Sequence, residues 1–314
     1  MKAVRIHAYG GVDQLRLEEI PDPTPGPGEV LVENEYASVN PLDCKLRGGS
    51  RRLVLPLKFP AVLGFDLAGR VKAVGADVTA FKVGDEVFGR SGQQGGRAYA
   101  ELVALNAGDI AEKPAGLSTR EAAAIPHAAL TALQALRDKA GLKPGASVLV
   151  NGASGGVGVY AIQIARALGA ARVTGVCSAA NAELVRGLGA DDVIDYKSTD
   201  PVAGNEQYDV IFDCVASLSY GRATRALRKG GAYVTTLPHP SLLWAALRAV
   251  FSGKKAALVV VKTSGTDVAL LGRYVEAGKL RAVIDSEFAL ADIARAHEKS
   301  ESGRARGKIL VKIR

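Results

Sequence analysis

The stretch Val148-Leu-Val-Asn-Gly-Ala-Ser-Gly-Gly-Val-Gly158 decides the fold of this chain. Its first three residues are apolar, small residues follow them, and a helix-like run occupies residues 159–168. A strand, a tight turn and a helix in this order can hold a dinucleotide pyrophosphate at the helix N-terminus. The pattern is Ala153-x-Gly155-x-x-Gly158, with alanine in place of the first glycine of the usual fingerprint. Such turns also occur as plain connections, but the flanking strand and helix favour cofactor binding.

The chain around this turn has the pattern of a parallel sheet. From residue 146 to 236, predicted strands alternate with predicted helices, and the strands are unbroken apolar runs. That pattern is typical of a parallel sheet covered by helices on both faces, which gives a Rossmann, doubly wound domain. The strands are expected at 147–150, 172–177, 192–194, 209–214 and 232–236, and the helices at 159–168, 182–188 and 220–227.

The regions before and after this domain lack its regular alternation of strands and helices. Strand-like pieces punctuated by glycine and proline fill roughly the first 120 residues and predict a β-rich unit. Ser118-x-x-Glu121 is a capping box that begins an alanine-rich helix, and a second helix is expected at 131–139. Elements at 270–277, 282–287, 290–300 and 308–313 are expected to return to the first unit. We therefore predict an α/β protein with domains at 1–122 and 123–265 and a C-terminal return at 266–314.

Composition narrows the class of protein. The 314 residues are 48% hydrophobic and 23% charged, as in soluble globular proteins. No apolar run is long enough to span a bilayer, and no signal-peptide core is present, so we expect a cytoplasmic protein. Cys44, Cys177 and Cys214 are far apart, which predicts neither a disulfide framework nor a cysteine-rich zinc site. The net charge of +8 suits a phosphorylated dinucleotide, whereas specific nucleic-acid binding lacks a basic run with interleaved aromatic residues.

The second strand of the predicted dinucleotide domain indicates which cofactor binds. NAD-binding domains carry an acidic residue near the end of this strand, but here it ends at Ser178 without a carboxylate. Ser178 and Asn181 can donate hydrogen bonds to a 2′-phosphate, and Tyr196 can add another. Arg172 and Lys197 either supply positive charge nearby or are simply solvated. These residues favour NADPH over NADH; the alternative is that the loop is small and polar only because it is a turn.

Six stretches, in the same order along the chain, resemble the zinc-independent medium-chain dehydrogenase/reductases, most closely the quinone oxidoreductase branch. They are residues 38–45, 59–69, 83–88, 131–136, 153–158 and 307–310. The resemblance implies a GroES-like β-rich catalytic domain, a Rossmann domain, a cofactor cleft between them and a homodimer. It places the cofactor on Ala153, Ser154, Gly155, Gly156, Val157 and Gly158. Thr131 resembles the residue that contacts the nicotinamide carboxamide; its alternative role is a hydroxyl at a helix start.

The resemblance also bears on zinc. Zinc-containing members place a cysteine where this chain has Asn40 and a histidine where it has Phe65, and neither replacement is an ordinary zinc ligand. The third ligand position falls near His127, and the short linker 90–97 stands where a four-cysteine lobe is expected. We therefore predict no catalytic zinc. His127 is interpreted as a satisfied interdomain histidine, with a catalytic role as the alternative.

Without zinc, hydride transfer to a conjugated acceptor is favoured over alcohol oxidation. A quinone or enone accepts hydride at carbon and leaves charge on oxygen, where hydrogen-bond donors stabilise it. By resemblance, Asn40 and Lys45 face the nicotinamide: Asn40 holds the ring or the substrate carbonyl, and Lys45 supplies positive charge. Related quinone reductases often have tyrosine at the Lys45 position, so a tyrosine proton donor does not carry over. Asp43 is expected to organise the loop. An ion pair between Asp66 and Lys45 is the structural alternative to a functional role for either residue.

Two further segments have alternative interpretations. Lys308 either reaches a cofactor phosphate or is a lysine on a strand edge. The apolar, helix-like stretch 237–251, with Trp244, lines the substrate pocket, packs in the core or forms a dimer contact. The sequence thus predicts an NADPH-dependent quinone or enone reductase with a small-molecule partner, no specific nucleic acid and no membrane span. The alternatives are a zinc-free alcohol or aldehyde reductase, and a low-turnover NADPH-binding protein that serves interaction or RNA binding.

Overall fold

The computed structural model describes residues 1–204, 207–237 and 253–314. It divides into two compact units, unit 1 (Met1–Leu130 with Lys262–Arg314) and unit 2 (Thr131–Val261). The boundaries thus follow residues 130 and 261, whereas the sequence placed them after 122 and 265. Most of the stretch 237–251, including Trp244, lies outside the described residues, so the roles expected for it stay predictions.

Unit 1 is built around one long strand. This strand, β3, pairs antiparallel with β5, β7 and β16, and the seven-stranded sheet has the order β15-β16-β3-β5-β6-β8 with β7 also on β3. A smaller sheet has the order β2-β1-β4. The strands are β1 (Lys2–Ile6), β2 (Arg16–Glu19), β3 (Glu29–Val39), β4 (Ala61–Val62), β5 (Asp66–Val74), β6 (Glu86–Arg90), β7 (Leu102–Asn106), β8 (Ile110–Glu112), β15 (Ile284–Ala289) and β16 (Lys308–Lys312).

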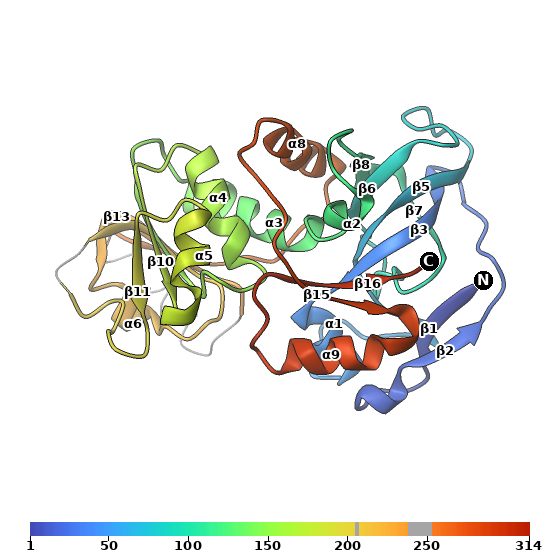
Figure 1. Ribbon diagram of the computed structural model, residues 1–314, viewed down its shortest axis with the longest axis horizontal. Helices are drawn as coiled ribbons and strands as arrows, with labels where there is room; N and C mark the ends of the chain where they lie inside the picture. Colours follow the sequence, from blue (N-terminus) through green and yellow to red (C-terminus); the bar gives the residue numbers. More distant parts are fainter. Residues whose placement is uncertain (205–206, 238–252) are drawn as a thin grey trace. The chain divides into compact units, whose positions relative to one another are not determined.

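The C-terminal segment completes the sheet of unit 1. In Figure 1, the red strand β16 runs beside the blue strand β3, and their pairing joins Ile309 to Val39. The helices of this unit are α1 (Pro41–Arg47), α2 (Thr119–Ala122), α8 (Gly265–Glu276) and α9 (Ile293–Glu301), and α3 (Pro126–Leu133) begins in it. The expected helix 290–300 is a short 3-10 turn, η5 (Leu290–Asp292), followed by α9. The Ser118 capping box is confirmed, because the Ser118 hydroxyl accepts from the Glu121 amide.

Unit 2 is a Rossmann-type parallel sheet. Its six strands have the order β11-β10-β9-β12-β13-β14, and every neighbouring pair is parallel. The order reverses at β9, which has β10 on one side and β12 on the other, so the carboxyl ends of these strands form the crevice where such sheets bind ligands. The strands are β9 (Ser147–Asn151), β10 (Arg172–Cys177), β11 (Asp192–Asp195), β12 (Tyr208–Asp213), β13 (Leu227–Thr235) and β14 (Lys255–Leu258).

The helices of unit 2 follow the predicted pattern with two corrections. Helices α4 (Gly158–Ala167) and α5 (Ala182–Gly187) lie within a residue of their predicted bounds, but α6 (Tyr220–Ala223) is half as long as expected. The helix expected at 131–139 begins earlier, because α3 starts at Pro126, and it continues as a wider π-type helix, η3 (Gln134–Ala140). Among the described residues, no helix has both the length and the apolar character needed to cross a membrane.

Candidate active site

The turn between β9 and α4 is closely packed backbone. Gly152 has a φ of +78°, and a Cβ on Gly158 would lie 2.1 Å from the Gly152 carbonyl oxygen, so only glycine fits at the helix start. Ala153 is fully buried, and a Cβ on Gly175 of β10 would lie 3.1 Å from its methyl group. Alanine therefore fills the space beside the next strand, and the N-terminus of the ten-residue helix α4 is left as an anion site made of backbone N–H groups.

Three side chains expected near the adenosine ribose lie at the same edge of the sheet. Ser178 follows β10, and Asn181 donates from Nδ2 to the Ser154 hydroxyl over 3.0 Å. Tyr196 follows β11, is 58% exposed, and its amide donates to the Cys177 carbonyl oxygen over 3.3 Å. Asn181 Oδ1 is buried and has no hydrogen-bond partner among the described residues, so it is an acceptor left open beside the turn. These residues fit a dinucleotide that carries a hydroxyl or phosphate at this position.

The charged residues found near this edge are not all the ones that the sequence analysis placed there. Arg172 is the first residue of β10 and pairs with Asp192 over 2.8 Å, so it lies at the opposite end of a strand roughly 20 Å long. Its expected closeness to Ser178 was wrong. Burial, and then the charge of Asp195, raises the pKa of Cys177, and the charge of Arg186 of α5 acts in the opposite direction. Asp195 of β11 is the register partner of Cys177, so this edge also carries a carboxylate.

Thr131 lies in the interior of α3, not at its start. The helix begins at Pro126, so Thr131 is well inside it, and the side chain is only 6% exposed. The alternative of a hydroxyl at a helix start was therefore wrong. The nicotinamide contact stays a prediction.

Unit 1 holds a buried polar cluster formed by Ser38, Asn40, Asp66 and Lys308. Asp66 Oδ2 accepts from Lys308 Nζ over 3.3 Å, from Asn40 Nδ2 over 3.0 Å and from the Ser38 hydroxyl. Lys308 Nζ also donates to Asn40 Oδ1 over 2.5 Å, so the contacts form a closed ring. All four residues are buried, Lys308 to 3% exposure and Asp66 completely. This network fixes the orientation of the Asn40 side-chain carboxamide.

The cluster corrects two expectations from the sequence. The ion-pair partner of Asp66 is Lys308 and not Lys45, and β16 lies between β15 and β3, so Lys308 is not on a strand edge. Burial alone would raise the pKa of Asp66, but the charge of Lys308 and the hydrogen bonds to the carboxylate outweigh burial and lower it. The carboxylate is therefore held ionised. The phosphate contact expected of Lys308 stays a prediction.

Helix α1 carries Asp43, which contacts this cluster, and Lys45 two residues later. Asp43 Oδ2 accepts a hydrogen bond from the backbone N–H of Asn40 over 2.7 Å, which confirms that Asp43 organises the loop. Burial, with a further contribution from Asp66, raises the pKa of Asp43 to about 7. Lys45 is half-buried and has no ion pair among the described residues; burial, followed by the charge of Arg51, lowers its pKa. It is a cation without a neutralising partner, which suits a role toward a developing negative charge.

Comparison with known proteins assigns the family. Residues 26–135 match the alcohol dehydrogenase GroES-like domain, and residues 188–311 match a domain described as zinc-binding dehydrogenase. The chain is 38% identical to the chloroplastic quinone-oxidoreductase QR1 of Triphysaria versicolor, and the match covers 99% of this chain and 98% of that protein. This chain belongs to the medium-chain dehydrogenase/reductase family. Its β-rich unit 1 and Rossmann unit 2 are the two domains of that family, as the sequence predicted.

Further relatives of this medium-chain reductase point to the same branch. The chloroplast envelope quinone oxidoreductase homolog of Arabidopsis thaliana is 36% identical, with 99% of this chain and 98% of that protein covered. The structure of the quinone oxidoreductase from Coxiella burnetii matches with a TM-score of 0.90 and 32% identity over 100% of this chain and 99% of that one. The Escherichia coli quinone oxidoreductase complexed with NADPH matches with a TM-score of 0.87 and 27% identity, covering both chains completely. At the family level these findings support NAD(P)H-dependent oxidoreductase activity of the quinone oxidoreductase type.

The positions of zinc ligands in this medium-chain reductase hold other groups. Arg90 Nε donates to His127 Nδ1 over 3.0 Å, and the Arg90 guanidinium lies 4.5 Å from the centre of the Phe65 ring. The His127 amide donates to Asp66 Oδ1 over 2.6 Å. Burial and the charge of Arg90 lower the pKa of His127 to about 3, so its imidazole is neutral. Among the described residues, no group of three histidine, cysteine or acidic side chains is arranged to hold a metal ion.

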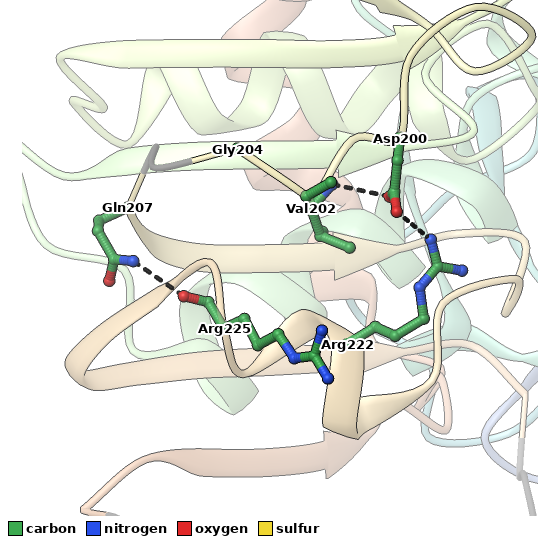
Figure 2. Close-up of a pocket in the computed structure, with 7 residues that line it drawn as sticks. Asp200, Val202, Gly204, Gln207, Arg222 and Arg225 are labelled. Atoms are coloured by element: carbon green, nitrogen blue, oxygen red, sulfur yellow. Dashed lines mark hydrogen bonds and ion pairs between the residues drawn. The ribbon is translucent and has the colours of Figure 1, made fainter.

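A surface pocket of unit 2 lies away from the cofactor turn. Figure 2 shows this pocket of about 380 Å³, with Arg222 paired to Asp200 and Gln207 bonded to the Arg225 carbonyl oxygen. Its lining residues lie in the segment that leads into β12 and in α6 and the turn that lead into β13, at the amino ends of these strands. The turn at 152–158 follows the carboxyl end of β9. The pocket is therefore at the opposite edge of the sheet and is not the dinucleotide site.

Proposed function

We propose that this chain is a zinc-independent, NADPH-dependent reductase that transfers hydride to a quinone or an α,β-unsaturated carbonyl. The observation that carries the cofactor assignment is the edge beyond β10, where Ser178 follows the strand and no carboxylate takes the ribose position. Ser178, Asn181 and Tyr196 gather there with hydrogen-bond donors. An NADPH complex among the related structures supports the same assignment.

The turn of unit 2 binds the dinucleotide through its backbone. The N–H groups of Ser154, Gly155, Gly156 and Val157, with the N-terminus of α4, are suited to the pyrophosphate. Ala153 and Gly158 give this turn its close packing on the strands. Thr131 is proposed to hold the carboxamide, as the family resemblance implies. Lys308 is not proposed as a phosphate ligand, because its buried ammonium group already bonds Asp66 and Asn40. When bound, NADPH supplies the hydride at nicotinamide C4.

The residues of unit 1 are proposed to orient and polarise the acceptor. Lys308 and Asp66 hold the Asn40 amide in one orientation, because each bonds to a different end of it. Asn40 then orients the ring or the acceptor carbonyl, and the charge of Lys45 stabilises the oxygen that becomes negative when carbon accepts hydride. Protonation of that oxygen by water completes the reduction. The 2-methylene-furan-3-one reductase of Solanum lycopersicum, 35% identical over 99% of this chain, is a relative whose name describes a conjugated ketone substrate.

An assay of NADPH oxidation with a panel of quinones, enones and aldehydes tests this function. We expect turnover with quinones or enones and little with saturated aldehydes, and we expect Asn40→Ala to lower kcat. Turnover of aldehydes alone would favour an alcohol or aldehyde reductase. Tight NADPH binding without turnover of any acceptor would favour a cofactor-binding protein of the interaction class. Gel filtration of the same sample tests the homodimer.

A further inference from the structure

The loop after α1 exposes three aliphatic side chains in succession. Leu53 is 94% exposed, Val54 77% and Leu55 44%. Among the large hydrophobic residues that the structure describes, none is more exposed than Leu53. Single apolar side chains on a surface are ordinary, whereas a contiguous exposed group marks a surface that another phase or molecule covers. We refer to residues 51–59 as the basic-apolar loop.

This loop is an ordered projection. The Val54 and Leu55 amides both donate to the Arg51 carbonyl oxygen, over 3.0 and 2.7 Å, so the tip is a closed turn. At its base, the Leu57 amide donates to the Tyr9 hydroxyl over 2.8 Å, and the Phe59 ring meets the Tyr9 ring edge-on at 4.8 Å between centroids. On the other side of the tip, the Arg52 amide donates to the Gly49 carbonyl oxygen over 3.1 Å, so the backbone is bonded on both sides. The aliphatic side chains are exposed because the fold directs them outward.

The charge around the tip has one sign. From residue 44 to residue 65 the chain carries five basic side chains and no acidic one. Three of them, Arg51, Arg52 and Lys58, flank the tip, and none has an ion pair among the described residues. The charge of Arg51 also contributes, after burial, to lowering the pKa of Lys45. An anionic surface is the complement of this arrangement.

We propose that the basic-apolar loop docks this chain on the surface of a bilayer that contains anionic lipids. Leu53, Val54 and Leu55 enter the boundary between headgroups and acyl chains, and Arg51, Arg52 and Lys58 contact the lipid phosphates. A purely acidic protein partner would use the cations and leave the aliphatic tip in water, whereas a lipid surface uses both. The proposal concerns binding only and does not depend on the proposed reductase function.

Co-sedimentation of the full chain with lipid vesicles tests the proposal. One set of vesicles is phosphatidylcholine alone, and in the other about a third of the lipid is phosphatidylserine. We expect binding to the anionic vesicles, weak binding to the neutral ones, and release by high salt. Leu53→Ser with Val54→Ser, or Arg51→Glu with Arg52→Glu, is expected to lower the partition coefficient at least about tenfold.

A second exposed turn provides the matched control. Val83 is 63% exposed beside the exposed Lys82, so Val83→Ser and Lys82→Glu make changes of the same kind elsewhere on unit 1, and they are compared with the single changes Leu53→Ser and Arg51→Glu. These variants are expected to bind vesicles like the parent chain, and thermal melts confirm that each variant is folded. The proposal is overturned if the parent chain does not bind anionic vesicles, or if the control variants lose as much binding as the loop variants. Loss of self-association on Leu53→Ser with vesicle binding intact would also overturn it, because the loop would then be a protein contact.

Discussion

The cofactor turn of unit 2 and the polar cluster of unit 1 are built in different ways. The turn at 152–158 is made of backbone, and it works because Gly158 has no side chain to fill the space beside Gly152. The cluster is made of side chains, and it is held together because Asp66 and Lys308 form an ion pair that is almost completely buried. A backbone site depends on close packing, whereas a buried ion pair depends on both charges being present. Substitutions should therefore damage the two regions in distinguishable ways.

The largest effect is expected from breaking the buried ion pair. Lys308→Met leaves Asp66 charged and buried without its partner, which should cost about 3–5 kcal/mol of unfolding free energy in a urea titration. Arg172→Met is the control, because it breaks the exposed pair with Asp192, and it should cost about 1 kcal/mol or less. A double variant, Lys308→Met with Asp66→Asn, should recover part of the loss. Equal losses for Lys308→Met and Arg172→Met would show that the cluster is not held by its charges.

A smaller effect is expected from adding a methyl group to the turn. Gly158→Ala places a Cβ against the Gly152 carbonyl oxygen, so the backbone must shift, at a cost of roughly 1–3 kcal/mol. NADPH affinity measured by fluorescence titration should fall at least about tenfold. Gly221→Ala adds the same methyl group in unit 2 where no atom lies within 4 Å, and it should leave affinity unchanged. Unaltered NADPH binding by Gly158→Ala would contradict the proposed role of this turn.

Two buried groups of unit 1, His297 and Asp43, should give its stability a pH dependence. Burial, and then the charge of Arg47, lowers the pKa of His297 in unit 1 to about 3 from an ordinary 6.5. As the pH falls from 6.5 toward 3, the His297 imidazole is protonated in the unfolded chain but stays neutral in the folded one. The free energy of unfolding therefore decreases over this range. Asp43 acts with the opposite sign, since its raised pKa of about 7 favours the folded state as the pH falls from 7 toward 4.

Replacing His297 isolates its contribution. His297→Asn keeps an acceptor for Arg47 Nη1, which donates to His297 Nδ1 over 3.1 Å. Between pH 6 and 4 this variant should lose stability less steeply than the parent chain, by up to about 1.4 kcal/mol per pH unit. Amide hydrogen exchange followed by mass spectrometry should place the difference in unit 1. A parallel pH profile for the two proteins would show that His297 does not titrate on unfolding.

The two regions also differ in how far the sequence predicts them. The turn is contiguous, so a strand, small residues and a helix in succession predicted β9, the glycine-rich turn and α4. Asp66 and Lys308 are 242 residues apart, and no local pattern joins them, so Asp66 was matched with the nearer Lys45. Arg172 was misplaced because nearness in sequence ignored the direction of β10. Pro126 was a missed signal, since proline at the first helical position marks the start of α3 and places Thr131 inside it.

The cofactor preference of the parent chain tests the central proposal most directly. The measurement is the ratio of kcat/KM for NADPH to that for NADH with one quinone, repeated for Ser178→Asp. The account predicts a ratio well above one for the parent chain and a fall of about tenfold or more in the variant, because a carboxylate at that position repels a 2′-phosphate. A parent ratio at or below one, or a ratio that Ser178→Asp leaves unchanged, would contradict it.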